Sequence, residues 1–204
     1  MQLVVQPPAD HRSAEILLSV RQAFVDKGFD GASMQDLARA AGMSVGNFYR
    51  YFPSKSAIIT GMITLDRAEV QRDFAAILLS PTPLASLRDL IHHRILHDDD
   101  HGDGALWSEI DAAARRSADI GAAAQQMESA ITACLLSVFA AETGLTQNEA
   151  ATRFMPTAGF IIVLFKAAKC LMCSGHVDQS AIQTMILRTI DQTLDDVART
   201  ARKA

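Results

Sequence analysis

The sequence predicts an all-α protein of about nine helices, and three observations lead to this prediction. Apolar residues recur at three- and four-residue spacing through most of the 204-residue chain, which is the period of a helix with one buried face. Segments with the alternating pattern of a strand are nearly absent. The breaks between periodic segments hold Gly, Pro, Ser and Asp, which cap and end helices. A hydrophobic content of 49% is enough to form a sizeable core.

Three helices are expected in the first 55 residues. The first covers residues 13–27 and ends at a glycine. Ser33 can cap a second, short helix that Gly42 ends, and an acid at the third helical position makes this cap a variant of the capping box. Ser44 can cap a third helix, VGNFYRY, which ends before Pro53 because a proline disfavours helical geometry in the preceding residue.

The remaining helices are longer. A fourth is expected from Lys55 to about Leu79, where the sequence PTP follows. Later helices are expected at residues 84–97, 105–116, 118–142, 147–173 and 178–202, separated by segments rich in turn formers or charge. This layout predicts an N-terminal domain of three helices, residues 1–55, and a helical C-terminal domain, residues 56–204.

Charge is distributed unevenly along the chain. The formal net charge is -4, but residues 1–60 carry six Lys and Arg against five Asp and Glu, while the remainder carries 13 against 18. Any surface that binds anions is therefore expected near the N-terminus.

The sequence shows no sign of export or of a membrane span. Its first residues lack the features of a secretory signal, and the most apolar run, 160–165, is closed by Lys166. The cysteines, Cys134, Cys170 and Cys173, are an odd set, which makes a disulfide framework a poor expectation. We expect a cytoplasmic protein with reduced cysteines and no membrane partner.

Residues 33–52 have the spacing of a helix-turn-helix unit. Gly42 makes the turn, and Leu37 and Phe48 point inward. Burial of Phe48 and Phe52 would stabilise the unit by about 1.5 to 3 kcal/mol each, which accounts for the phenylalanines without any appeal to function.

The opposite face of the third helix is not explained by packing. It carries Val45, Gly46, Asn47 and Tyr49, with Tyr51 near its end. A glycine lets a phosphate or base edge approach the backbone, an asparagine can bond an adenine edge, and tyrosine hydroxyls can reach phosphate oxygens. This surface suits DNA; the alternative is a small helical subdomain with two half-exposed tyrosines.

The segment GFDGASMQDLARAAGMSVGNFYRYFPSKSAII, residues 28–59, resembles the N-terminal domain of the tetracycline-repressor (TetR) family of bacterial regulators. The glycine before the second helix, the AG turn, the aromatic pair, YF, and a lysine two residues after the proline fall at the family spacing. The resemblance implies a ligand-responsive repressor that binds a partly palindromic operator in double-stranded DNA as a homodimer. A small, largely apolar effector, bound in the C-terminal domain, would release it.

The resemblance also implies roles for individual residues. Ser33 and Tyr49 match phosphate contacts, and Lys55 matches a phosphate-binding lysine at the start of the fourth helix. Gln35 and Asn47 depart from the arginine and threonine of many relatives, so the operator sequence does not follow from the resemblance. The expected DNA-binding residues are Ser33, Gln35, Ser44, Val45, Gly46, Asn47, Tyr49, Tyr51 and Lys55.

A homodimer is also supported by the apolar pattern of the last two predicted helices. The last carries a continuous apolar stripe and the preceding one a broad apolar surface, so two subunits would form a four-helix bundle. The alternative is that these surfaces close the core of one subunit. The expected interface residues are Phe160, Val163, Leu164, Ile182, Met185, Ile186, Ile190, Leu194 and Val197.

The effector is expected where the family builds its pocket, among the fourth, sixth, seventh and eighth helices. Apolar walls with few charges suggest a hydrophobic or amphipathic small molecule. Most of the candidates are also suited to an ordinary core. They are Met62, Asp66, Val70, Trp107, Met127, Ile131, Cys134 and Phe154.

Two clusters offer an alternative, a regulator that senses a metal or thiol oxidation. A solvated loop explains the first cluster as well, and buried cysteines explain the second, which has no evident fourth ligand. The clusters are His93, His97 and His101, and Cys170, Cys173 and His176. We expect neither a cofactor nor an enzyme, because the sequence offers no nucleophile with a base, no phosphate loop and no paired acids in a plausible pocket.

Overall fold

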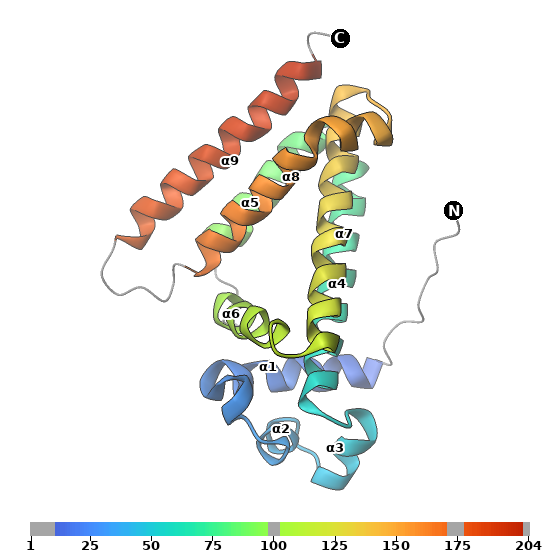
Figure 1. Cartoon of the computed structure of the whole chain (residues 1–204), viewed down its shortest axis with the longest axis vertical. Helices are drawn as coiled ribbons and strands as arrows, with labels where there is room; N and C mark the ends of the chain where they lie inside the picture. Colours follow the sequence, from blue (N-terminus) through green and yellow to red (C-terminus); the bar gives the residue numbers. More distant parts are fainter. Residues whose placement is uncertain (1–10, 98–102, 171–177, 202–204) are drawn as a thin grey trace.

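The computed structural model describes residues 11–97, 103–170 and 178–201, and within these ranges every regular element is a helix. Figure 1 shows an elongated molecule with three helices at one end and a bundle of longer helices above them. The all-α prediction is confirmed. The helices are α1 (His11–Gly31), α2 (Met34–Ala40), α3 (Val45–Tyr51), α4 (Lys55–Leu78), α5 (Pro83–Leu96), α6 (Asp103–Ala114), α7 (Ala118–Thr143), α8 (Gln147–Cys170) and α9 (Gln179–Ala201).

The short N-terminal helices begin at the serine caps that the sequence predicts. Ser33 Oγ accepts the Asp36 N–H at 3.1 Å while Asp36 Oδ2 accepts the Ser33 N–H at 3.0 Å, which completes the capping box. Ser44 and Ser54 also cap α3 and α4, each through a single bond in which the serine side chain accepts a backbone N–H. Between α2 and α3, Gly42 has φ +63°, a left-handed conformation that a glycine adopts without strain.

Helix α1 differs from the prediction at its end. The sequence predicts a glycine stop after Lys27, whereas the structure has a kink at Gly28, where φ is 69° and ψ is 168°, and a further turn reaches Gly31. The non-helical glycine redirects the chain without ending the helix. The last turn of α1 therefore lies against α6, a contact that becomes important below.

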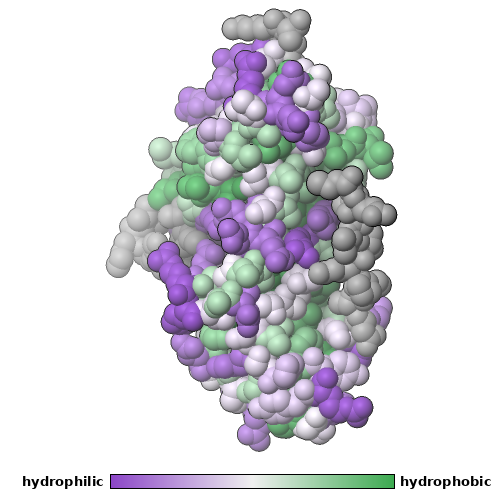
Figure 2. Space-filling model, turned by 45° about the vertical axis from the view of Figure 1, so that its right-hand side comes forward, coloured by the Kyte–Doolittle hydropathy of each residue, from purple (hydrophilic) through white to green (hydrophobic). Residues whose placement is uncertain are grey.

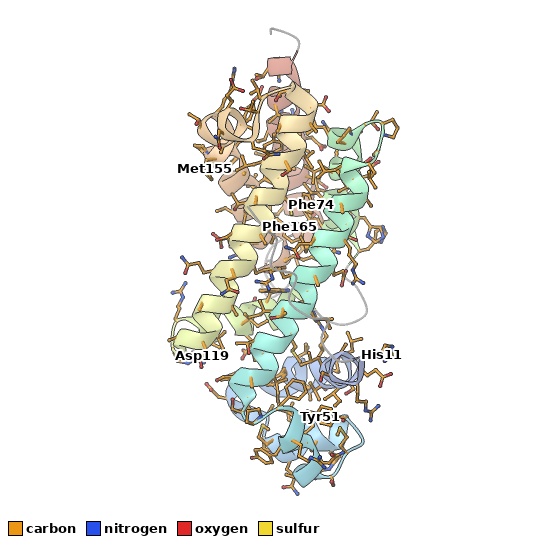
Figure 3. All side chains as sticks on the ribbon, turned by 90° about the vertical axis from the view of Figure 1, so that its right-hand side faces the viewer. His11, Tyr51, Phe74, Asp119, Met155 and Phe165 are labelled. Atoms are coloured by element: carbon orange, nitrogen blue, oxygen red, sulfur yellow. The ribbon has the colours of Figure 1, made fainter. Side chains whose placement is uncertain are left out.

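The buried apolar residues form two clusters that meet along α4 and α7. The lower core joins α1, α2 and α3 to the first half of α4, to α6 and to the start of α7. The upper core joins the second half of α4 to α5, α8, α9 and the rest of α7. Val70 and Ile131 pack against both cores. Figure 3 shows α4 and α7 running side by side along the length of the molecule.

Helix α8 is the one described helix that is long and apolar enough to cross a membrane, yet it is packed into a bundle on one side. Only 28% of its most apolar window is buried within the subunit. Phe160 and Val163 are 46% and 61% exposed, whereas Lys166 pairs with Glu128 of α7 at 3.0 Å. The helix thus presents an apolar face that one subunit leaves uncovered. Figure 2 shows another face of the molecule, where hydrophobic side chains also gather mainly in the upper half.

Candidate nucleic-acid interface and internal cavity

Helix α3 lies at the end of the molecule and turns one side inward. Phe48 is fully buried and packs with Phe52, the ring centres 5.9 Å apart. Every other residue of the helix is exposed. Tyr49 is 47% and Tyr51 37% exposed, although both are large side chains that usually bury most of their area. Figure 3 shows Tyr51 at this lower end of the molecule.

Gly46 stands in open space on the outer side of α3. A Cβ added there would meet no atom within 4 Å, so packing within the subunit does not require a glycine. A glycine in a helix nevertheless costs about 0.5 to 1 kcal/mol relative to alanine. Val45 and Asn47 flank it and are exposed. This part of the surface therefore allows another molecule to approach the backbone.

The expected contact residues on α2 lie at the same end. Gln35 and Ser44 are exposed. Ser33 is exposed too, and its hydroxyl donates to Asp36 Oδ2 at 2.6 Å. Hydrogen bonds from the Lys27 ammonium and from Ser33 hold the pKa of Asp36 well below its usual range, so this carboxylate is charged at neutral pH.

The structure gives Lys55 a role within the subunit. Its ammonium donates to the carbonyl oxygens of Phe29 at 2.7 Å and Asp30 at 3.1 Å, and it lies 5.0 Å from the centre of the Phe29 ring. An ammonium has three donors, so one N–H is left after these two bonds. Lys55 thus ties the start of α4 to the last turn of α1.

Sequence reasoning missed two cations at this end. Arg39 on α2 is 73% exposed at its side chain, and Arg50 on α3 is exposed between the two tyrosines. Arg50 lies in the last turn of α3, where a basic residue also interacts favourably with the helix dipole. A basic residue between two exposed aromatic residues was the signal that could have identified it.

A cavity of roughly 1060 Å³ lies at the seam between the two cores. Its size is at the upper end of the range for small-molecule sites. Five of the eight expected effector residues line it: Asp66, Val70, Trp107, Met127 and Ile131.

The other three expected effector residues are placed elsewhere. Met62 is fully buried in the lower core, Phe154 packs edge-on against Phe139 in the upper core, and Cys134 packs against the same upper core. Burial raises the pKa of the Cys134 thiol, which makes it a poor nucleophile. Helical spacing predicted the faces of these helices but not which part of each face lies at the seam.

The cavity wall is more polar than the sequence predicts. The guanidinium of Arg94 binds Glu69 at 2.8 Å and Asp73 at 2.6 Å. Burial alone would lower the pKa of Arg94, but the bonds to these two carboxylates raise it. Arg21 of α1 binds Asp66 at 2.7 Å, with both side chains largely buried.

The predicted dimer residues fall into two groups in the structure. Phe160, Val163 and Met185 are exposed, and Leu164 and Ile182 are half-buried. The other four are buried inside the subunit, so little of their surface is left for a partner: Ile186, Ile190, Leu194 and Val197. For this group the structure follows the alternative, in which the stripe of the last helix closes the core of one subunit.

The two metal clusters are described only in part. His93, in the last turn of α5, and His97, at its C-cap, have ring centres 4.8 Å apart, and both line the cavity. The described residues contain no group of three or more potential metal ligands. The remaining predicted members lie outside the described residues or, for Cys170, have no described side chain: His101, Cys170, Cys173 and His176.

Together these features define a class of protein: a helix-turn-helix head on a helical bundle with an internal cavity. Residues 16–62 match the family model for "Bacterial regulatory proteins, tetR family". The helix-turn-helix end is therefore similar to the N-terminal domain of TetR-family regulators, as the sequence predicted, and the alternative of a metal- or thiol-sensing regulator is not favoured.

The sequence relatives match over part of the chain. The transcriptional regulator EthR of Mycobacterium tuberculosis is 36% identical over 84 residues, which are 41% of this chain and 38% of EthR. UidR of Escherichia coli K12 is 27% identical over 132 residues, 63% of this chain and 64% of UidR. Each match thus spans less than two thirds of the curated relative.

The fold is similar to solved structures over nearly the whole chain. Salmonella enterica GusR superposes with a TM-score of 0.69 at 21% identity, covering 94% of this chain and 98% of GusR. The similarity in fold therefore includes the C-terminal helices as well as the helix-turn-helix.

Proposed function

We propose that this protein is a ligand-responsive transcriptional repressor that binds a partly palindromic operator in double-stranded DNA as a homodimer. The observation that carries the proposal is the orientation of α3, in which Phe48 alone is buried. The face that carries Val45, Asn47 and Tyr49 is left free for a major groove. Residues 1–55 would form the DNA-binding domain, and residues 56–204 the effector-binding and dimerisation domain.

Contacts with the sugar-phosphate backbone would come from hydroxyls and cations at the rim of this surface. Tyr49 and Ser33 expose hydroxyls there, and the third N–H of Lys55 can reach a phosphate while its other two bind α1. Arg50 adds a cation that is not among the DNA-binding residues expected from the sequence. Asn47, with two donors and an acceptor, is the best candidate for reading a base edge.

The homodimer is supported by the apolar face of α8 and α9. Phe160, Val163 and Met185 expose 46%, 61% and 68% of their area, which is unfavourable in water and would be covered by the same face of a second copy. A two-fold axis through this face would place two α3 helices on one duplex. A cytoplasmic location follows from this function, because the regulator must reach its operator DNA.

The cavity supports release by a small amphipathic effector. Trp107, Met127 and Ile131 provide an apolar wall, and the Arg94 and Arg21 ion pairs provide polar contacts. The effector is expected to be largely apolar with at least one polar group, since a purely apolar molecule would leave these ion pairs desolvated without compensation.

Selection of bound sequences from a random DNA pool tests the proposal. The purified protein should enrich a site with two-fold symmetry, and its affinity should fall steeply as salt rises because several phosphates are contacted. Tyr49→Phe combined with Lys55→Ala should weaken binding to all duplexes alike, whereas Asn47→Ala should relax the preference at one position of each half-site.

Two controls make this test specific. Arg72→Ala removes a positive charge on an exposed part of α4, far from α3, and should leave binding unchanged. Circular dichroism should show that the Lys55→Ala variants are folded, because Lys55 also holds α1. If the double variant is folded and binds the selected duplex as tightly as the wild type, the assigned DNA surface is wrong.

A further inference from the structure

Helix α6 touches three parts of the molecule with different sides. Trp107 and Asp111 line the cavity, whereas Leu106 and Ile110 are fully buried in the lower core. Figure 1 shows α6 between the upper bundle and α1. One helix therefore forms part of the cavity wall and part of the lower core, which also contains α2 and α3.

Glu109 extends from α6 to the last turn of α1. Its Oε2 accepts the Phe29 N–H at 2.8 Å, in a partly buried position. This approach needs the kink at Gly28, where φ is +69° and an added Cβ would lie 3.3 Å from the same Oε2. Just past the end of α6, Arg116 binds the carboxylate of Asp30 at 3.2 Å.

The turn that Glu109 contacts is also bound from the other side. The Lys55 ammonium, at the start of α4, bonds the carbonyl oxygens of Phe29 and Asp30. The same turn leads directly to Ser33, which caps α2. The Phe29–Asp30 turn is therefore a joint at which α1, α4 and α6 meet just before the helix-turn-helix.

The start of α6 is closely packed against α8. A Cβ on Gly104 would lie 2.8 Å from the carbonyl oxygen of Lys169, so the helix start is already in close contact with the backbone of α8. Movement of the start of α6 toward α8 would therefore meet the α8 backbone, whereas Glu109, on the same helix, is bonded to α1.

We propose that Glu109 is a positioning residue that transmits occupancy of the cavity to α2 and α3 through the Phe29 amide. This inference rests on the proposed function, because it presupposes that α3 binds DNA. The coupling would pass through the direct contact between α6 and α1, in addition to any coupling through α4, which belongs to both cores. Since coupling between two sites is reciprocal, DNA bound at α3 must also alter the surroundings of Trp107.

Trp107 makes this reciprocity measurable, because it is the single tryptophan of the chain. The probe is the duplex selected by the wild-type protein, and the readout is Trp107 emission on titration with that duplex. In the wild type we expect emission to change with DNA occupancy. In Glu109→Ala we expect the amplitude to fall about threefold or more, while the duplex Kd stays within about fivefold, the range expected for loss of one hydrogen bond.

Two comparison variants separate positioning from simple destabilisation. Glu109→Gln keeps an oxygen that can accept the Phe29 N–H and should retain the response. Glu142→Ala removes an acid near the end of α7 and should behave as the wild type. Where Glu109→Ala is poorly folded, Arg116→Ala provides the second test, because it breaks the neighbouring contact with Asp30 at the surface and should also reduce the amplitude.

The outcomes distinguish this inference from the proposed function. If the wild type enriches no duplex, the proposed function fails. If it binds DNA but Trp107 emission does not change, or if the Glu109→Ala response equals that of the wild type, the α6 connection is wrong and DNA binding stands. A loss of DNA binding itself in folded Glu109→Ala would show a purely structural role and would also overturn the inference.

Discussion

Gly46 provides the sharpest separation of folding from function, because Gly46→Ala should change the two in opposite directions. The residue is second in the seven-residue α3, and an added Cβ meets nothing within 4 Å, so the methyl group carries no steric cost in the free protein. The higher helix propensity of alanine should raise the free energy of unfolding by about 0.5 to 1 kcal/mol. In a chain of this size that corresponds to a rise in Tm of about 1 to 4 °C.

DNA binding should weaken in the same variant. The methyl group would occupy the space that we assign to a phosphate or base edge, and loss of one charged hydrogen bond costs about 1.5 to 3 kcal/mol, or about tenfold or more in Kd. Calorimetry gives the Tm, and fluorescence anisotropy with a labelled duplex gives the Kd. Ser129→Ala, at an exposed site on α7, is the control: it should raise stability slightly without any effect on Kd.

Two results would refute this reasoning. An unchanged Kd would mean that no part of the duplex approaches the α3 backbone, although the glycine leaves room for it. A lower Tm would mean that the outer side of α3 is packed against something in solution, contrary to its exposure in the structure.

Three further predictions concern other parts of the molecule. Val163→Glu should convert the proposed dimer into monomers in sedimentation experiments, whereas Leu79→Glu, at a site 87% exposed at the end of α4, should remain dimeric. Because the hydrogen bond from Lys27 lowers the pKa of Asp36 in the folded state, the stabilisation by this carboxylate should be present above the ordinary Asp pKa of about 4 and decline as the pH falls below it, so the urea midpoints of the wild type and Asp36→Asn should differ more at pH 7 than at pH 3. Gly104→Ala should lower the free energy of unfolding by about 1 to 3 kcal/mol, measured in urea, since its Cβ would lie 2.8 Å from a backbone oxygen of α8; an unchanged midpoint would show that α6 can move.

Local features of the fold could be predicted from the sequence, because their causes are local. Serine caps and a left-handed glycine set the limits of α2 and α3, and each acts within four residues. The inward Phe48 and the exposed tyrosines follow from the same short register. The exposed residues of α3, which form most of the proposed DNA-binding surface, can therefore be predicted without the tertiary structure.

The cavity could be predicted only in outline, because it depends on contacts between distant residues. Arg21 and Asp66 are 45 positions apart, and no pattern in either helix shows that they pair. Lys55 illustrates the same limit: its position suggested a phosphate contact, and its bonds to α1 appear only when α1 and α4 are brought together. Periodicity likewise shows that α9 has an apolar face but not that Ile190 and Leu194 are covered within one subunit.

The membership of α6 in the lower core has a consequence for how the protein is made. When residue 55 has just been added to the chain, the lower core that holds Phe24 and Phe48 is not complete, because Ile58, Leu106 and Ile110 are added later. The proposed DNA-binding end would thus remain incomplete until the chain has grown past α6. Newly made protein would acquire an operator-binding surface only after much of its regulatory part exists.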